Sequence, residues 1–327
     1  MTIDMVVADK NTFIRWAVEQ PQLPVFFQPW YLDAVCSNGQ WQAHLYQNDK
    51  GTIEGVLVYY LTTKYKRPVI IMPMLTPYSG IWMTPATAEK EVYKTRNINK
   101  IVAELAHSIP SDVVLYRQSF LPEFNNWMAF YWQRYFQTTR YTFVIEDLKQ
   151  WSLNDAATNV RNKINKASAL ITITEDIPLE KVYQMADDIL TQKGIQLQWK
   201  QDAFMRWDEV LNKHSKRFIV GAKDSDGRVH AAAYVIVDQA TAYLMILASD
   251  KVLRKSGAVP LVIYHAIMKA AKVATRFDFE GSMLASLFDL FSGFGGKLTP
   301  YHSIYKTKNL FWQLAYHYKM RKDNLNR

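Results

Sequence analysis

Short apolar runs separated by turn residues divide the chain into strands and helices. Runs at 41–47 and 52–61 flank an Asn-Asp-Lys-Gly turn, a spacing that predicts a β-hairpin. Runs at 217–222 and 228–237 flank a second turn, Lys-Asp-Ser-Asp-Gly. In each half the hairpin is followed by another apolar run and then by a helical pattern. The pattern therefore predicts the same structural unit twice.

The two hairpins define a repeat of domain size. Their turn glycines, Gly51 and Gly227, lie 176 positions apart (227 − 51), which excludes a short solenoid repeat. A strand pattern at 141–148 and a polar turn after it place a boundary near residue 150. We therefore expect an α/β (mixed α+β) protein with two domains, 1–150 and 151–327, each a mixed β-sheet flanked by helices.

Composition and charge narrow the class of protein. Hydrophobic residues make up 49% of the 327 residues and charged residues 21%, as in ordinary folded proteins. The single cysteine, Cys36, excludes an internal disulfide framework and favours a reduced, cytoplasmic setting. The first residues lack the basic lead and apolar stretch of a signal peptide. A formal net charge of +9 favours an anionic partner, with plain solubility as the alternative explanation.

A turn before a long apolar helix pattern is the first candidate site. Arg254, Ser256, Gly257 and Ala258 precede a helix expected at 260–272. Backbone N–H groups and the helix dipole at such a helix start can hold a pyrophosphate, so these four residues are candidates for binding a phosphate-bearing donor. An ordinary strand-to-helix turn explains the same pattern.

Alternating aromatic and acidic residues predict a strand at 275–280. The alternation with Phe277 and Phe279 sends the carboxylates of Asp278 and Glu280 to one face. A carboxylate at a strand end can take the proton from an attacking amine, which makes Glu280 a candidate catalytic base. The alternative is that Glu280 binds backbone N–H groups of the following helix start. Asp278 is expected to be structural.

Two loops share the sequence Leu-Thr-Pro-Tyr, starting at Leu75 and Leu298. Proline fixes each bend, and a phenol follows it, an arrangement suited to lining a cleft. Thr76, Tyr78 and Tyr301 are therefore candidate substrate-binding residues. The alternative is two proline-terminated strand ends with tyrosines packed in the core.

Other polar features give fewer constraints. Arg161, Lys163 and Lys166 lie on one predicted helix, where they either bind a phosphate-bearing substrate or form a solvated face. The seven histidines show no ligand spacing, so no metal site is expected. The aromatic helix pattern at 309–322 ends in cations, and it either contacts a membrane surface or docks on its own domain.

Two segments of the second half are distinctive: Arg276-Phe-Asp-Phe-Glu-Gly-Ser282 and Leu287-Phe-Asp-Leu-Phe-Ser-Gly-Phe-Gly-Gly296. They resemble the Fem family, peptidyltransferases with two tandem GNAT-like domains that add amino acids from aminoacyl-tRNA to peptidoglycan precursors. With segments 141–148 and 161–167, and with Tyr305-Lys306, which is similar to an aromatic-lysine pair near the family's C-terminus, the resemblance covers most of the chain. It implies that Lys306 and Tyr305 are catalytic and stabilise charge at the transferred acyl group. The resemblance is strongest to bacterial members whose substrates are mostly unassigned.

The chain also departs from this family. It has Ser292 where the family has a lysine before Phe-Gly, and no Pro-Arg-Gly-Pro loop in the first domain. The resemblance thus implies an N-acyltransferase that moves an acyl or aminoacyl group, with acyl-CoA the favoured donor, onto an amine. The first domain would shape the acceptor site and the second would bind the donor and carry catalysis. The alternatives are a Fem-type transferase that uses aminoacyl-tRNA and a cell-wall precursor at the inner membrane face, and a non-catalytic binding protein.

Overall fold

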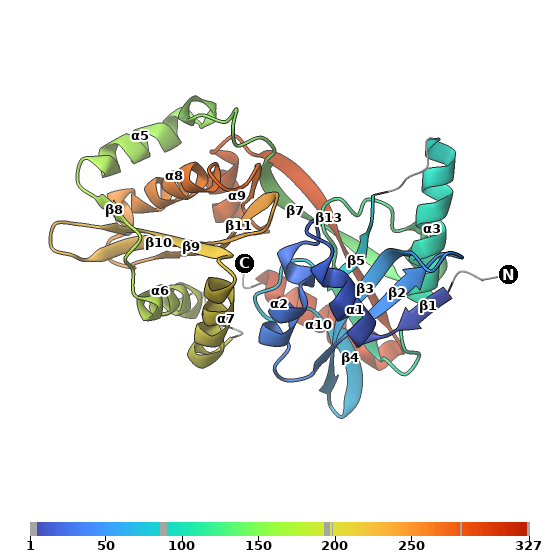
Figure 1. Cartoon of the computed structure of the whole chain (residues 1–327). Coiled ribbons are helices and arrows are strands. Elements are labelled where there is room, and N and C mark those ends of the chain that lie inside the picture. The colour runs from blue at the N-terminus through green and yellow to red at the C-terminus, as the bar shows by residue number, and fades with distance from the viewer. Residues whose placement is uncertain (1–4, 86–89, 193–196, 198, 282, 326–327) are drawn as a thin grey trace. The chain divides into compact units, whose positions relative to one another are not determined.

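The chain folds into two compact units, each built on parallel and antiparallel strands. Figure 1 shows the computed structural model, which describes residues 5–85, 90–192, 197, 199–281 and 283–325. Unit 1 comprises Met1–Arg140 and Pro300–Arg321, and unit 2 comprises Tyr141–Thr299 and Lys322–Arg327. The C-terminal segment 300–321 thus belongs with the first half of the chain, whereas the sequence-based division at residue 150 assigns it to the second domain.

Unit 1 is built on a sheet with the strand order β1-β2-β3-β4-β6-β13, in which β5 also pairs with β3. Only β4 and β6 are parallel, and α3 lies between them in the chain. The described elements that contribute to this unit are β1 (Met5–Ala8), α1 (Lys10–Val18), α2 (Pro29–Val35), β2 (Gln40–Gln47), β3 (Ile53–Lys64), β4 (Arg67–Ile71), β5 (Gly80–Met83), α3 (Glu91–His107), β6 (Leu115–Ser119), α4 (Met128–Trp132), β13 (Lys297–Thr307) and α10 (Leu310–Leu325).

Strand β13 shows why the C-terminal segment joins unit 1. Residues Ser303 to Thr307 pair antiparallel with β6, and Ile304 is completely buried in the core beneath α3. Trp312 of α10 packs on Val69 and Val114 of the same unit. Pairing with β6 and burial of its side chains both stabilise β13 in unit 1, although β13 follows the strands of unit 2 in the sequence.

Unit 2 has the strand order β7-β12-β11-β10-β9-β8, in which only β11 and β12 are parallel. In Figure 1, α5 and α8 cover one face of this sheet and α6 and α7 the other. The described elements that contribute to this unit are β7 (Phe136–Ile145), α5 (Thr158–Ser168), β8 (Thr172–Thr174), α6 (Leu179–Gln192), α7 (Gln201–Lys213), β9 (Arg217–Lys223), β10 (Val229–Val237), β11 (Thr241–Ser249), α8 (Ala258–Ala270), β12 (Arg276–Asp278) and α9 (Ala285–Ser292).

The core of unit 2 follows from the sequence of β10, which is buried along its whole length. On one face Ala231 and Ala233 carry small side chains and share a core cluster with residues of α8. On the other face Tyr234 stacks on Trp207 of α7, with ring centroids 4.9 Å apart. Small residues admit a close helix and large rings fill the opposite layer, so the alternating pattern of β10 places a helix on each face.

The two units repeat one order of elements, which confirms the predicted mixed α/β fold with tandem domains. In unit 1 it is β2, β3, β4, α3 and β6; in unit 2 it is β9, β10, β11, α8 and β12. Three expectations need correction or stay open. The strand expected to reach 280 ends at Asp278, and the helix expected from 260 begins at Ala258. The sequence also predicts a helix over 179–193 with a C-cap at Gly194, and this glycine lies outside the described residues.

Candidate functional site

Strands β11 and β12 of unit 2 diverge after a short parallel pairing. The pairing runs only from Thr241 with Arg276 to Tyr243 with Asp278, where β12 ends, while β11 continues to Ser249. Within the described part of unit 2, residues 244–249 of β11 have a strand partner on the β10 side alone. On its other edge, this stretch of β11 therefore has backbone N–H and C=O groups that no described strand pairs with.

A β-bulge lies in the same stretch of β11. Tyr234 of β10 pairs with Ile246 and Val235 pairs with Leu244, so Met245 is an extra residue in β11. A bulge bends a strand and increases its local twist, and bulges are common beside active sites. Here it turns β11 at the point where β12 ends, which favours the divergence of the two strands.

The two acidic residues at the end of β12 have different surroundings. Asp278 is buried and accepts hydrogen bonds from the Thr142 hydroxyl and from the backbone N–H of Glu280, at 2.5 and 2.8 Å. These contacts agree with the structural role expected of Asp278. Glu280 is partly buried and has a φ of 53°, a left-handed conformation that costs free energy in a non-glycine residue. The carboxylate proposed as base therefore lies on a strained turn just beyond the strand end.

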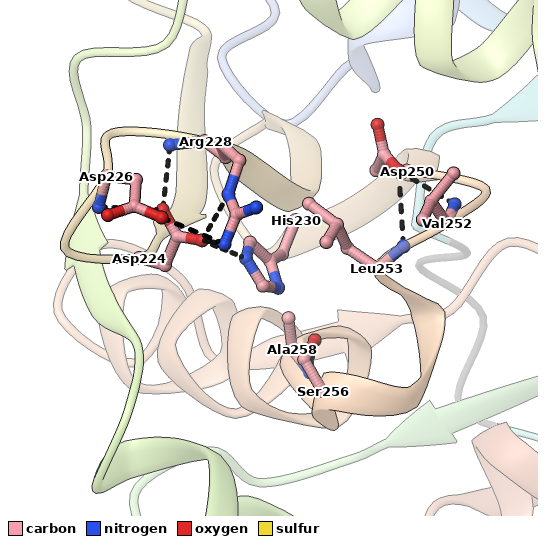
Figure 2. A network of polar contacts seen from close by, with 9 residues as sticks. All are labelled: Asp224, Asp226, Arg228, His230, Asp250, Val252, Leu253, Ser256 and Ala258. Carbon is pink, nitrogen blue, oxygen red and sulfur yellow. Dashed lines mark hydrogen bonds and ion pairs between the residues drawn. The ribbon is translucent and has the colours of Figure 1, made fainter.

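The loop after β11 leads directly to the predicted phosphate site. Asp250 fixes its start, because its Oδ1 accepts the backbone N–H groups of Val252 and Leu253 at 2.8 and 3.2 Å. A 3₁₀ turn at Arg254–Ser256 follows, then Gly257 with a φ of 78°, and α8 begins at Ala258. Figure 2 shows the polar contacts of this loop. The structure thus places the four predicted donor-binding residues together at a helix N-terminus.

The first turn of α8 offers few free amides. The N–H of Ala258 donates to the Ser256 hydroxyl at 3.3 Å, and Pro260 has no N–H. Val259 contributes an N–H that has no acceptor within the helix, as expected of any first turn. The Ser256 hydroxyl thus already occupies one amide of this turn. A bound phosphate would depend more on side-chain cations than on a full set of backbone amides.

Helix α5 lies against this loop. A Cβ atom built on Gly257 would come within 3.0 Å of the Lys163 carbonyl oxygen and 3.3 Å of the Ala167 Cβ. Gly257 is therefore required both by its positive φ and by the approach of α5. The structure brings the predicted cationic helix beside the predicted phosphate loop, two features that lie far apart in the sequence.

The cations around the loop are available to a ligand to different degrees. Lys163 and Lys166 are exposed, and among the described residues neither has an ion-pair partner. Arg254 is exposed and donates to the Gln192 side chain at 3.3 Å. Arg161 differs, because it braces the start of its own helix.

The bonds of Arg161 are local. Its two terminal nitrogens donate to the Asn154 carbonyl at 3.3 Å and to the Thr158 hydroxyl at 3.1 Å. These contacts favour a structural role for Arg161, while its charge still adds to the positive potential of α5.

A buried histidine next to the loop was not singled out from the sequence. His230 is 6% exposed, its Nε2 lies 3.0 Å from Asp224 Oδ2, and its buried Nδ1 has no hydrogen-bond partner among the described residues. Figure 2 shows the ring between the Asp224 carboxylate and the start of α8. The hydrogen bond from His230 and the neighbouring Arg228 guanidinium hold the pKa of Asp224 well below its usual range. The only sequence signal was an acidic turn closely followed by a histidine.

The two Thr-Pro-Tyr loops meet inside unit 1. The rings of Tyr78 and Tyr301 pack edge to face with centroids 5.2 Å apart, and Arg140 Nε donates to the Tyr301 hydroxyl at 3.2 Å. Tyr78 is completely buried, Tyr301 is 6% exposed, and the Thr76 hydroxyl donates to the Met74 carbonyl. The expected proximity of the two tyrosines is observed, but the expectation that their hydroxyls face an open cleft is wrong, because the core of unit 1 surrounds them.

Tyr305 and Lys306 lie on opposite faces of β13 in unit 1. Tyr305 stacks between Phe136 and Tyr316, with centroid distances of 5.5 and 4.5 Å. Lys306 donates to the Gln133 carbonyl at 2.9 Å and lies 4.5 Å from the Tyr135 ring centroid. Their role at a transferred acyl group stays a prediction, and the contacts of Lys306 lead to a different interpretation below.

The described residues contain no group of three His, Cys, Asp or Glu side chains that could hold a metal ion. In the same part of the chain, no helix has both the length and the hydropathy needed to cross a membrane.

The repeated mixed sheets define the class of fold: a tandem GNAT fold of the Fem-like type, as the sequence resemblance implied. FemX superposes on 91% of this chain and 96% of its own length, with a TM-score of 0.62 at 11% identity. A tandem GNAT protein from the clavulanic acid biosynthesis pathway covers 92% of this chain and 97% of its own, with a TM-score of 0.52 at 10% identity.

A third similar structure is the C-terminal domain of a protein assigned as a lysylphosphatidylglycerol synthetase of Agrobacterium fabrum. It covers 92% of this chain and 93% of its own, with a TM-score of 0.55 at 10% identity. No family model matches the chain, and no curated protein does. At such identities the likeness establishes the fold.

Proposed function

We propose that the protein is an N-acyltransferase whose donor carries phosphate groups and binds in unit 2. One observation carries the proposal: the open edge of β11 leads into the loop Arg254–Ala258, and the cationic helix α5 contacts that loop through Gly257. An extended donor arm can pair with β11 while its phosphates meet the cations at the start of α8. Acyl-CoA is the donor that fits this arrangement best.

The reaction is direct transfer of the acyl group. An amine attacks the acyl carbonyl, a C–N bond forms, and the C–S bond to the donor thiol breaks. Glu280 takes the proton that the amine loses, and the leaving thiolate gains a proton from solvent. The left-handed turn at Glu280 supports this role, because strained residues of this kind cluster at active sites. Unit 1 shapes the acceptor site in this proposal.

Calorimetry with acetyl-CoA tests the donor. The Arg254→Ala variant should bind acetyl-CoA about 10- to 150-fold more weakly, which corresponds to about 1.5–3 kcal/mol for one charged hydrogen bond. Lys272→Ala is the matched control, because Lys272 is an exposed cation just beyond the other end of α8 and should leave the affinity unchanged. Absence of acetyl-CoA binding in the unmodified protein would exclude this donor.

The role of Glu280 has its own test. Glu280→Gln should bind acetyl-CoA normally but lower the rate of thiol release in the presence of an amine acceptor by about 10²–10⁴-fold, the usual contribution of a general base. An unchanged rate would show that Glu280 is not the general base.

Transfer from aminoacyl-tRNA is the second candidate. The exposed cations Lys163, Lys166, Arg254 and Lys255 exceed what one pyrophosphate requires, and the chain carries a net charge of +9. Such a surface suits a polyanion, and the fold is shared with FemX. Filter binding of charged tRNA at several salt concentrations distinguishes the two donors, since binding to many phosphates weakens steeply with salt. A protein that binds either ligand without turnover would be the non-catalytic alternative.

The acceptor side of the proposal includes contact with an anionic membrane surface, where a lipid-linked cell-wall precursor would be found. Helix α10 buries Trp312 and Tyr316 against unit 1 but leaves other large apolar side chains exposed, Leu310, Phe311, Leu314 and Tyr318 at 61–73%. Apolar side chains with cations nearby are typical of helices that lie on a membrane surface.

A further inference from the structure

A hollow in unit 1 lies outside the loop and strand edge described above. It has a volume of about 240 Å³ and opens between the end of α3, the turn that follows it, and the last residues of β13. The side chains that matter for its chemistry are those of Pro110, Val113, Tyr135 and Lys306, with Lys308 at the exposed rim. No acidic residue lines it.

Lys306 supplies a cation that the protein does not neutralise. Its only hydrogen bond in the described chain goes to the Gln133 carbonyl, so two of its three donors remain for a ligand. No carboxylate of a described residue pairs with it. Burial, helped by the charge of Arg134, lowers the pKa of Lys306. A bound anion would offset the free-energy cost of partly burying this ammonium without a carboxylate partner.

Tyr135 supplies a second donor at the same place. The residue is 6% exposed and lines the hollow, and its hydroxyl makes no hydrogen bond within the described residues. The hydroxyl is not among the described polar atoms that are both fully buried and without a partner, so it is accessible to a ligand. Burial raises the pKa of Tyr135, so the hydroxyl stays protonated and can donate. The phenol and the two remaining donors of Lys306 therefore lie at the same hollow, where one acceptor can meet both side chains.

The shape of the hollow indicates the class of ligand. One partly buried ammonium and one phenol match the two oxygens of a carboxylate, and Pro110 and Val113 offer apolar wall. A phosphate dianion requires more donors, and the other lysine nearby, Lys308, is exposed and already donates to the Ser111 carbonyl at 3.0 Å.

We propose that this hollow is a binding site for a small aliphatic carboxylate, with Lys306 pairing with the carboxylate and the Tyr135 hydroxyl donating to it. Lys306 is then a binding residue of unit 1. The proposal does not rest on the transferase function, since every residue in it belongs to unit 1 and none belongs to the loop Arg254–Ala258.

Ligand-observed NMR titration of the full chain with isovalerate tests the site. Isovalerate should bind saturably, and its neutral isostere isovaleramide should not. Lys306→Met should weaken isovalerate binding by about 10-fold or more, and Tyr135→Phe by about 2- to 10-fold, as expected for a charged and a neutral donor. Lys308→Met removes the same charge at the rim and should change the affinity by less than about 2-fold.

Four results would overturn the proposal. Three come from the unmodified protein: no saturable isovalerate binding, equal binding of isovaleramide, or tighter binding of inorganic phosphate in the same titration. The fourth is an effect of Lys308→Met as large as that of Lys306→Met, because general charge would then explain the binding. If Lys306→Met does not fold, Tyr135→Phe together with the comparison of acid and amide decides the question.

Discussion

Two glycines of unit 2 allow the contact between α5 and the loop Arg254–Ala258 to be tested directly. Gly257 and Gly227 have the same φ of 78°. At Gly227 an added Cβ would meet nothing within 4 Å, whereas at Gly257 it would meet the Lys163 carbonyl at 3.0 Å and the Ala167 Cβ at 3.3 Å. The variants Gly257→Ala and Gly227→Ala should therefore have the same backbone strain, and only Gly257→Ala also has a steric clash with α5.

The expected energies follow from these two causes. An alanine forced into the left-handed region costs about 1–2 kcal/mol at either position. Overpacking against a neighbouring helix adds about 1–3 kcal/mol, which applies to Gly257 alone. The free energy of unfolding should therefore fall by about 1–2 kcal/mol in Gly227→Ala and by about 2–5 kcal/mol in Gly257→Ala.

Urea unfolding followed by tryptophan fluorescence measures this difference, because Trp207 and Trp151 report on unit 2. Acetyl-CoA binding gives a second measurement. Gly257→Ala should push α5 and its lysines away from the loop and weaken binding, whereas Gly227→Ala should not. Equal losses of stability in the two variants, with equal affinities, would refute the packing of α5 on the loop.

Two further predictions concern a carboxylate and a helix face. The hydrogen bond with His230 lowers the pKa of Asp224. The stability that the Asp224 carboxylate contributes is therefore present above its ordinary pKa of 3.8 and is lost as the pH falls toward the lowered value. Urea unfolding should show a constant difference in stability between the unmodified protein and Asp224→Asn from pH 7 to 5, and a smaller difference below about pH 4. The double variant Phe311→Ser, Leu314→Ser should co-sediment less with phosphatidylglycerol vesicles than the unmodified protein does. With neutral vesicles, both proteins should sediment little and to the same extent. Equal sedimentation of the two proteins with phosphatidylglycerol vesicles would exclude α10 as the membrane contact.

The hairpins and the repeat could be predicted because local sequence determines them. The turn glycines Gly51 and Gly227 need a positive φ, and the apolar runs beside them are long enough to form strands, so the β2–β3 and β9–β10 pairs follow from neighbouring residues alone. The turn before α8 could be predicted for the same reason, since Gly257 and the helix after it are adjacent in the chain; that it binds a donor stays a prediction.

The parts that could not be predicted depend on long-range packing. The pairing of β13 with β6 joins residues that lie far apart in sequence, and no local pattern marks it. Burial of Tyr78 against Phe26 and Tyr301 has the same origin, because a Thr-Pro-Tyr turn is compatible with both an exposed and a packed phenol. The contacts of Lys306 with Gln133 and Tyr135 exist only once β13 has joined unit 1.

In the proposed function, the start of α8 limits the kind of donor that the protein can select. Ser256 occupies the N–H of Ala258 and Pro260 supplies none, so a rigid set of backbone amides is reduced to a few groups. Long exposed side chains such as Lys163 and Lys166 must then provide most of the attraction. Such cations recognise charge more than shape, and their attraction is weakened by salt. A donor with several phosphates is therefore favoured over one with a single phosphate, and direct comparison of acetyl-CoA with charged tRNA becomes the decisive measurement.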